Sequence, residues 1–140
     1  MQPGYGWGGK SLASASMTEK KVADRSAVLG EDFRAGAKDA LEKVRRGFSE
    51  LQADNPSLQL NSPSDWEIEV HLANTDNRFL VQIDFDKNEL IFVSPESGGR
   101  TYFLDAESGR WRDRTDGHGF DGLLTRDVMR HCYGVPNFML

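Results

Sequence analysis

The stretch of residues 80–117 constrains the fold more than any other part of this 140-residue chain. Short runs rich in β-branched and aromatic residues alternate there with turn-forming residues, which cluster at positions 86–88, 94–99 and 107–109. Turn clusters between such runs are typical of antiparallel strands that follow one another in sequence order. The stretch therefore predicts an antiparallel meander.

An amphipathic helix is predicted on each side of the strands. Residues 31–53 carry apolar side chains at steps of three or four, and Asn55-Pro56 ends this helix because the residue before a proline avoids the α region. Its apolar stripe is Phe33, Ala37, Leu41, Val44, Phe48 and Leu51. The second helix is predicted over residues 118–131, with the stripe Phe120, Leu123, Leu124, Val128 and Cys132. Two helices on one face of an antiparallel sheet of five or six strands predict an α+β two-layer sandwich.

Alternation along the strands separates side chains that face the core from those that face water. The inner face is predicted to hold Trp66, Ile68, Val70, Leu72, Phe79, Val81, Ile83, Phe85, Leu90, Phe92, Tyr102 and Leu104. The outer face is predicted to hold Leu80, Gln82, Asp84, Glu89, Ile91, Val93, Thr101 and Phe103. Apolar side chains rimmed by charge on an uncovered face indicate a docking surface for a protein partner. The alternative is the ordinary scatter of apolar residues that most protein surfaces carry.

The chain divides into three parts. Residues 1–30 form a Gly/Ser-rich arm, residues 31–134 the folded domain, and residues 135–140 an apolar tail that we expect to lie along the helices and help close the core. The arm is either a flexible tail or expression remnant, or a partner-binding segment that presents Tyr5 and Trp7.

Composition excludes several classes of function. The net charge of −5 argues against nucleic-acid binding through a basic face. The single cysteine, Cys132, excludes an internal disulfide, and no apolar run approaches the ~20 residues of a membrane-spanning helix. No catalytic residues are predicted, because no Ser-His-Asp or Cys-His constellation stands out and Cys132 lies on a helix stripe.

Carboxylates of the first helix and of the adjoining strand are candidate iron ligands, because hard oxygen donors suit hard cations. They are Glu31, Asp32, Asp39 and Glu42 on the helix, and Glu67 and Glu69 on the strand. The alternative is a solvated helix face held by salt bridges.

The order of one helix, six strands and one helix resembles the frataxin family, and two motifs strengthen the resemblance. One is Asn88-x-x-Ile91-x-x-Ser94-Pro95-x-Ser97-Gly98-x-x-x-Tyr102. The other is Trp111 followed by Asp116-Gly117 and then Leu123-Leu124. The resemblance covers about residues 30–134.

The resemblance implies a role without enzymatic chemistry in mitochondrial iron–sulfur cluster assembly. It implies weak iron binding through an acidic ridge on the first helix and the sheet edge. It also implies docking on a cysteine desulfurase–scaffold complex through the outer sheet face. The sequence departs from the family at that face, where Ile91 replaces a tryptophan, Thr101 replaces an arginine, and Asp84 and Glu89 replace neutral amides. The first helix is mixed in charge instead of strongly acidic, with six acids and five bases over residues 30–54.

Two functional hypotheses follow. In the first, the chain is a non-catalytic interaction subunit of a larger, mitochondrial assembly, which needs no cofactor and docks through the outer sheet face and the N-terminal arm. The alternative is an iron-binding regulator of iron–sulfur cluster assembly. The first hypothesis is favoured because the positions that carry the family's docking are substituted, while the positions that keep the fold are retained.

Overall fold

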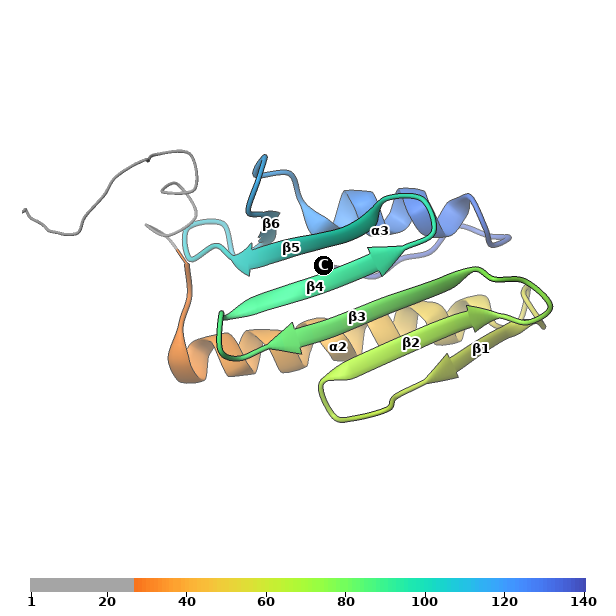
Figure 1. Ribbon diagram of the computed structural model, residues 1–140, viewed down its shortest axis with the longest axis horizontal. Helices are drawn as coiled ribbons and strands as arrows, with labels where there is room; N and C mark the ends of the chain where they lie inside the picture. Colours follow the sequence, from red (N-terminus) through yellow and green to blue (C-terminus); the bar gives the residue numbers. More distant parts are fainter. Residues whose placement is uncertain (1–26) are drawn as a thin grey trace, which may run out of the picture.

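The computed structural model describes residues 27–140, which form one six-stranded antiparallel sheet with two helices on a single face (Figure 1). The strands lie side by side in sequence order, and the elements are α2 (Gly30–Leu51), β1 (Leu58–Asn61), β2 (Glu67–Leu72), β3 (Arg78–Asp84), β4 (Glu89–Ser94), β5 (Gly98–Leu104), β6 (Trp111–Asp113) and α3 (Phe120–Met129). The predicted α+β sandwich is confirmed. Both helices are slightly shorter than predicted, since α2 ends at Leu51 and α3 begins at Phe120.

Helix α2 packs its predicted stripe on the sheet, and all six stripe residues are buried. Two glycines allow close approach along the same helix. A Cβ atom on Gly36 would lie 2.4 Å from the Leu104 side chain, and one on Gly47 would lie 2.3 Å from the Phe138 ring. Glycine inside a helix costs about 1 kcal/mol relative to alanine. At these two positions the absence of a side chain makes room for a core residue.

The inner face of the sheet forms the core, as the alternation predicted. Along β2 and β3, buried inner residues alternate with half-buried outer ones. Phe85 points inward as predicted, since its ring lies 5.8 Å from that of Phe33 and 4.7 Å from that of Trp66, but it lies at the edge of the core and is 36% exposed. β3 ends at Asp84, whose carboxylate accepts hydrogen bonds from the backbone N–H groups of Asp86 and Lys87. The chain therefore leaves the strand register just before Phe85.

The C-terminal tail completes the core, as predicted. Phe138 is 1% exposed, and its ring lies 5.2 Å from that of Phe48. The buried amide of Asn55 fixes the start of the tail. It donates to the carbonyls of Leu51 and Tyr133, at 2.8 and 2.9 Å, and accepts from the Tyr133 N–H at 2.8 Å. The end of α2 and the tail are therefore tied together, although they lie far apart in the sequence.

The turn between β4 and β5 is locked onto α3 by a buried carboxylate. Asp127 is fully buried, and the hydroxyls of Ser94 and Ser97 each donate to its Oδ2 atom at 2.6 Å. Arg126 donates to Oδ1 at 3.1 Å. Burial alone would raise the pKa of Asp127, but these hydrogen bonds lower the pKa below its ordinary value. The Ser94-Pro95-x-Ser97 motif thus has a structural role.

The described chain joins the sheet at Ala27, which pairs with Asp105, while the Val28 N–H donates to the Leu104 carbonyl at 2.8 Å. The predicted arm residues Tyr5 and Trp7 lie outside the described residues. Within residues 27–140, neither helix is long and apolar enough to span a membrane.

Candidate docking surface

The outer face of the sheet is left uncovered by the two helices, which both lie on the other face (Figure 1). Strand register places its side chains in rows that cross the sheet. One row joins Leu80, Val93 and Gly99, and the next joins Gln82, Ile91 and Thr101. Side chains directly opposite each other on neighbouring strands are in contact distance.

Leu80, Ile91 and Val93 form the apolar centre of this face. Leu80 pairs directly with Val93, and Ile91 precedes Val93 by two positions on the same strand. Val93 is 37% exposed, and the other two are half-buried. Gly99 lies opposite Val93 on β5 and carries no side chain, so one flank of Val93 stays open. The apolar centre is thus a small patch of the sheet surface that stays accessible.

One end of the outer face is closed, which corrects the expectation that Phe103 and Glu89 are exposed there. Phe103 is 2% exposed and Glu89 is 9% exposed. The Arg114 guanidinium lies 5.9 Å from the centre of the Phe103 ring, and its Nε atom lies 2.6 Å from a Glu89 oxygen. Arg112 pairs with Phe103 in register. Long arginine stems can cover apolar surface while their charged ends meet a partner, and alternation alone does not reveal such covering.

Three acidic side chains on β2 and β3 line the rim of the apolar centre, and one of them, Asp84, pairs in register with the covered Glu89. Glu67, Glu69 and Asp84 are half-buried on β2 and β3. Glu69 pairs with Arg78 at 3.4 Å, and Asp84 caps the β3–β4 turn through backbone N–H groups. Gln82 and Thr101 are half-buried beside Ile91. Of the eight residues predicted on this face, six therefore remain accessible and two are covered.

The six candidate iron ligands do not converge. Glu31, Asp32, Asp39 and Glu42 are exposed on α2, which packs against the inner face of the sheet. Glu67 and Glu69 alternate with the buried Ile68 and Val70, so they point to the outer face. Asp39 pairs with Lys43 at 3.0 Å. Within residues 27–140, no group of three or more His, Cys, Asp or Glu side chains is placed to hold a metal ion.

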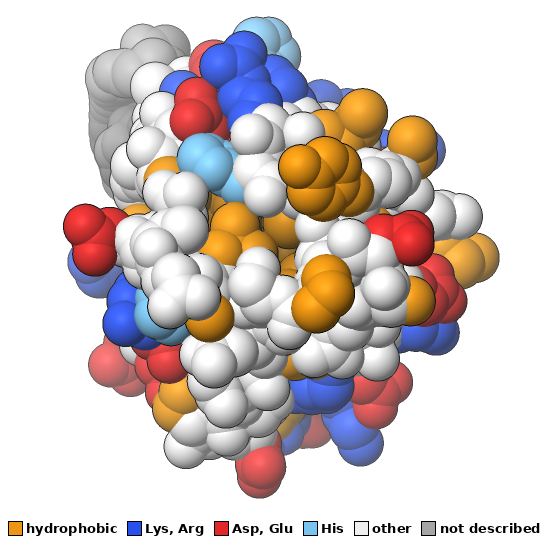
Figure 2. Space-filling model, turned by 90° about the vertical axis from the view of Figure 1, so that its right-hand side faces the viewer, with side chains coloured by type: hydrophobic (Ala, Val, Ile, Leu, Met, Phe, Trp, Pro, Cys, Tyr) orange, Lys and Arg blue, Asp and Glu red, His pale blue; other side chains and the backbone are white. Residues whose placement is uncertain are grey.

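Sequence reasoning missed a second apolar surface, where α3 ends. Figure 2 faces this end of the molecule and shows hydrophobic side chains around a hollow. Met129, Tyr133 and Val135 are 48, 80 and 78% exposed. The apolar composition of residues 133–140 is the sequence signal for this surface, but from the sequence alone it predicts only that the tail helps to close the core. Cys132, next to this surface, is buried, and burial raises the pKa of its thiol, which disfavours the reactive thiolate.

No family model and no curated protein matches the sequence. Solved structures do resemble it, and one is a frataxin from Psychromonas ingrahamii, described as a model for stability modulation within the CyaY protein family. The two chains are 15% identical, the match covers 79% of this chain and 98% of that one, and the TM-score is 0.65. At this identity the likeness establishes the fold, so the chain has the predicted frataxin-like fold.

Proposed function

We propose that this protein is a non-catalytic, frataxin-like interaction subunit of a larger protein assembly, and that it docks through the outer sheet face. The carrying observation is the apolar centre, Leu80, Ile91 and Val93, which stays accessible on a face that neither helix covers. Burying apolar surface contributes about 25 cal/mol per Å². A partner that covers these side chains would therefore stabilise the complex, whereas in the free protein the same side chains stay in contact with water.

The rim determines what kind of partner fits. Glu67 and Glu69 lie on the β2 flank of the apolar centre, and Asp84 lies beside Glu89. The two arginines at the β6 flank are already paired with Glu89 and Asp105. Complementary charge around an apolar centre orients two proteins as they associate. The proposed partner therefore presents apolar side chains with Lys or Arg beside them. The N-terminal arm, with Tyr5 and Trp7, is part of the same proposal as a second contact.

Affinity purification of the full chain, followed by mass spectrometry, tests this proposal. We expect Ile91→Asp with Val93→Asp to lose partners that the unchanged protein retains, because two charges would be placed in the interface. Val135→Asp is the control, since Val135 is 78% exposed and lies in the tail after α3, outside the sheet. Retention of every partner by the sheet double variant would refute docking through this face. Tyr5→Ala with Trp7→Ala tests the arm separately.

A second candidate function is an iron-binding regulator of iron–sulfur cluster assembly that acts on a cysteine desulfurase–scaffold complex. The exposure of all four α2 carboxylates favours it, together with the frataxin-like fold. A mitochondrial location belongs to both candidates as a proposal. Titration with Fe²⁺ followed by NMR tests iron binding. Specific shifts at Asp39 and Glu42, abolished by Asp39→Asn with Glu42→Gln and unchanged by Asp76→Asn, would support it.

A further inference from the structure

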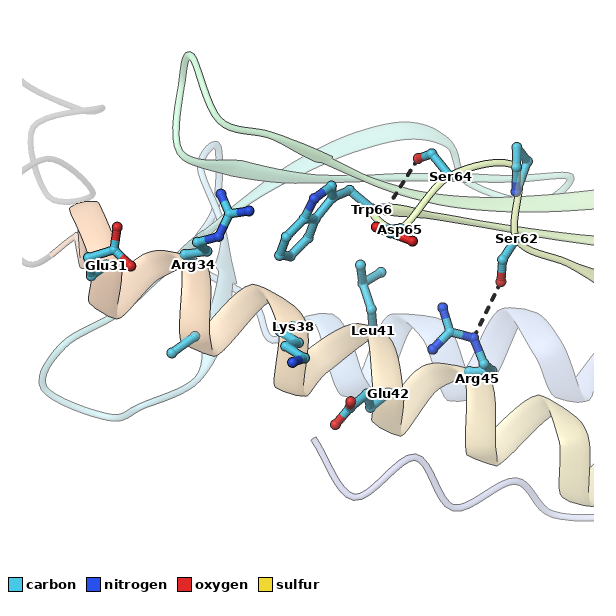
Figure 3. Close-up of a pocket in the computed structure, with 12 residues that line it drawn as sticks. Glu31, Arg34, Lys38, Leu41, Glu42, Arg45, Ser62, Ser64, Asp65 and Trp66 are labelled. Atoms are coloured by element: carbon cyan, nitrogen blue, oxygen red, sulfur yellow. Dashed lines mark hydrogen bonds between the residues drawn. The ribbon is translucent and has the colours of Figure 1, made fainter.

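A groove of about 800 Å³ runs between α2 and the connection from β1 to β2 (Figure 3). It is independent of the outer sheet face, because α2 packs on the opposite side of the sheet. One wall is a stripe of α2 that includes Arg34, Lys38 and Arg45. The other wall contains Ser62, Ser64 and the indole ring of Trp66.

The basic side chains of the α2 wall lie closer to the buried stripe than its acidic side chains do. Leu41 lies at one edge of the buried stripe of α2. At 3.6 residues per turn, the next side chains around the helix from Leu41 are those of Arg34, Arg45 and Lys38. Glu31 and Glu42 lie further around the helix, towards solvent. Figure 3 shows Arg34 facing Trp66 and Arg45 pointing towards Ser62, while Glu42 points away from the β1–β2 connection. The deep wall is therefore basic and its outer edge is acidic.

Two of the three cations are held in place by neighbouring side chains, and none of the three is neutralised by a carboxylate of the described chain. The Arg34 guanidinium stacks 4.8 Å from the centre of the Trp66 ring and 5.2 Å from that of Phe85. Arg45 Nε donates to the Ser62 hydroxyl at 3.3 Å. Among residues 27–140, no ion pair joins these arginines or Lys38 to a carboxylate. Stacking on aromatic rings fixes the orientation of a guanidinium and leaves its N–H edge available to an anion.

We propose that this groove binds an extended acidic peptide segment of a partner protein. Arg34 and Lys38 are four residues apart, which is about 6 Å along a helix, and two residues of an extended peptide span a similar length. Lys38 and Arg45 are about 10 Å apart along the axis, a distance between the spans of two and four extended residues, so carboxylates on the same face of the peptide reach both cations. Carboxylates of the segment pair with the three cations, and an apolar side chain of the segment packs on Trp66.

The acidic outer edge favours a peptide over a nucleic acid. Glu31 and Glu42 on the outer edge of α2, and Asp65 beside Trp66 on the other wall, line the same groove, and the chain carries a net charge of −5. A continuous polyanion would place phosphates beside these carboxylates, where like charges repel. A peptide can alternate carboxylates with neutral residues, so its acidic groups meet the basic wall only.

Fluorescence anisotropy with the full chain provides the test. The probe is a fluorescein-labelled peptide of ten residues in which glutamate alternates with valine, and the reference peptide has glutamine in place of each glutamate. We expect Arg34→Gln with Arg45→Gln to weaken probe binding by at least about tenfold, because charge-assisted hydrogen bonds are lost. The control, Lys87→Gln with Arg110→Gln, removes the same charge from two exposed side chains elsewhere and is expected to change affinity by less than about twofold.

A second measurement separates the groove from the outer sheet face and from misfolding. The probe is expected to shift the Trp66 indole N–H signal in NMR spectra and to leave that of the buried Trp111 in place, with Trp66→Phe used for assignment. Lys38→Glu, on an exposed side chain, retains the fold and is expected to weaken binding. Equal binding of the glutamine peptide, tighter binding of single-stranded DNA, or a probe response lost with Ile91→Asp would each overturn the proposal.

Discussion

The two faces of the sheet differ in how far alternation determines burial. On the inner face, helices and tail cover nearly every residue that alternation directs inward, and the covered side chains are apolar. On the outer face, burial varies along the strands. Phe103 is as buried as a core residue, whereas Val93, on the neighbouring strand, is 37% exposed. The difference arises because covering of the outer face depends on Arg112 in β6 and on Arg114, which directly follows β6.

This contrast separates structural from interaction surfaces. Where Arg114 covers Phe103 and pairs with Glu89, the outer face is part of the stable fold. Where Gly99 leaves Val93 uncovered, the same face is available to another protein. Stability measurements on matched pairs of residues can therefore locate the boundary between the two.

The largest loss of stability is expected on the covered side, from Phe138→Ala. Its ring fills the space left by Gly47 and packs on Phe48, so truncation leaves a cavity and should lower the free energy of unfolding by about 3–5 kcal/mol. Urea denaturation measures this change. Met139→Ala, at a neighbouring side chain that is 62% exposed, is the control and should change stability by less than about 0.5 kcal/mol. Similar effects of the two substitutions would show that the tail does not belong to the core.

Phe103→Ala tests whether the closed end of the outer face is structural. Its burial predicts a loss of about 3 kcal/mol in the free energy of unfolding, close to that of a core phenylalanine. Val93→Ala on the open part of the face should cost about 0.5 kcal/mol or less. If Phe103→Ala behaved like Val93→Ala in urea denaturation, the arginine cover would be too weak to exclude water from the ring.

Asp127→Asn tests the lock between the β4–β5 turn and α3, and we expect a loss of about 2 kcal/mol at neutral pH. Because the pKa of Asp127 is lower in the folded than in the unfolded protein, the stabilisation is present above the unfolded-state pKa of about 4. It is lost as the pH falls through the folded-state pKa. The variant should therefore lose less stability than the unchanged protein when the pH is lowered from about 5, above the unfolded-state pKa, to about 2. Asp76→Asn, at an exposed position, should keep the original pH profile.

The smallest effect on stability is expected from Val93→Asp, because an exposed position tolerates a charge. Thermal denaturation should show a change in the free energy of unfolding of less than about 1 kcal/mol. The same substitution is expected to disrupt docking. A large loss of stability would indicate that the apolar centre supports the fold instead of a partner.

Most of the fold follows from local patterns. The α2 stripe, the alternation along β2 and β3, and the turn residues between strands each match the structure to within a few residues. The predicted inward direction holds even for Phe85, although β3 ends one residue earlier, at Asp84, and the ring stays 36% exposed at the edge of the core. The prediction that Phe103 is exposed failed, because alternation gives the direction of a side chain but does not show whether another side chain covers it.

The order of the elements and the inner face of the sheet follow from the sequence alone, since these depend on periodicity and turn chemistry within short windows. The frataxin-like fold was expected from the resemblance of two motifs to that family, and the similarity to a solved structure establishes it. Only the tertiary structure decided which outer-face residues are accessible, since Arg114 reaches Phe103 and Glu89 across neighbouring strands. It also separated the α2 carboxylates from Glu67 and Glu69, and placed Arg34 on Trp66. Such contacts join residues distant along the chain, and their geometry is fixed when the helices pack on the sheet.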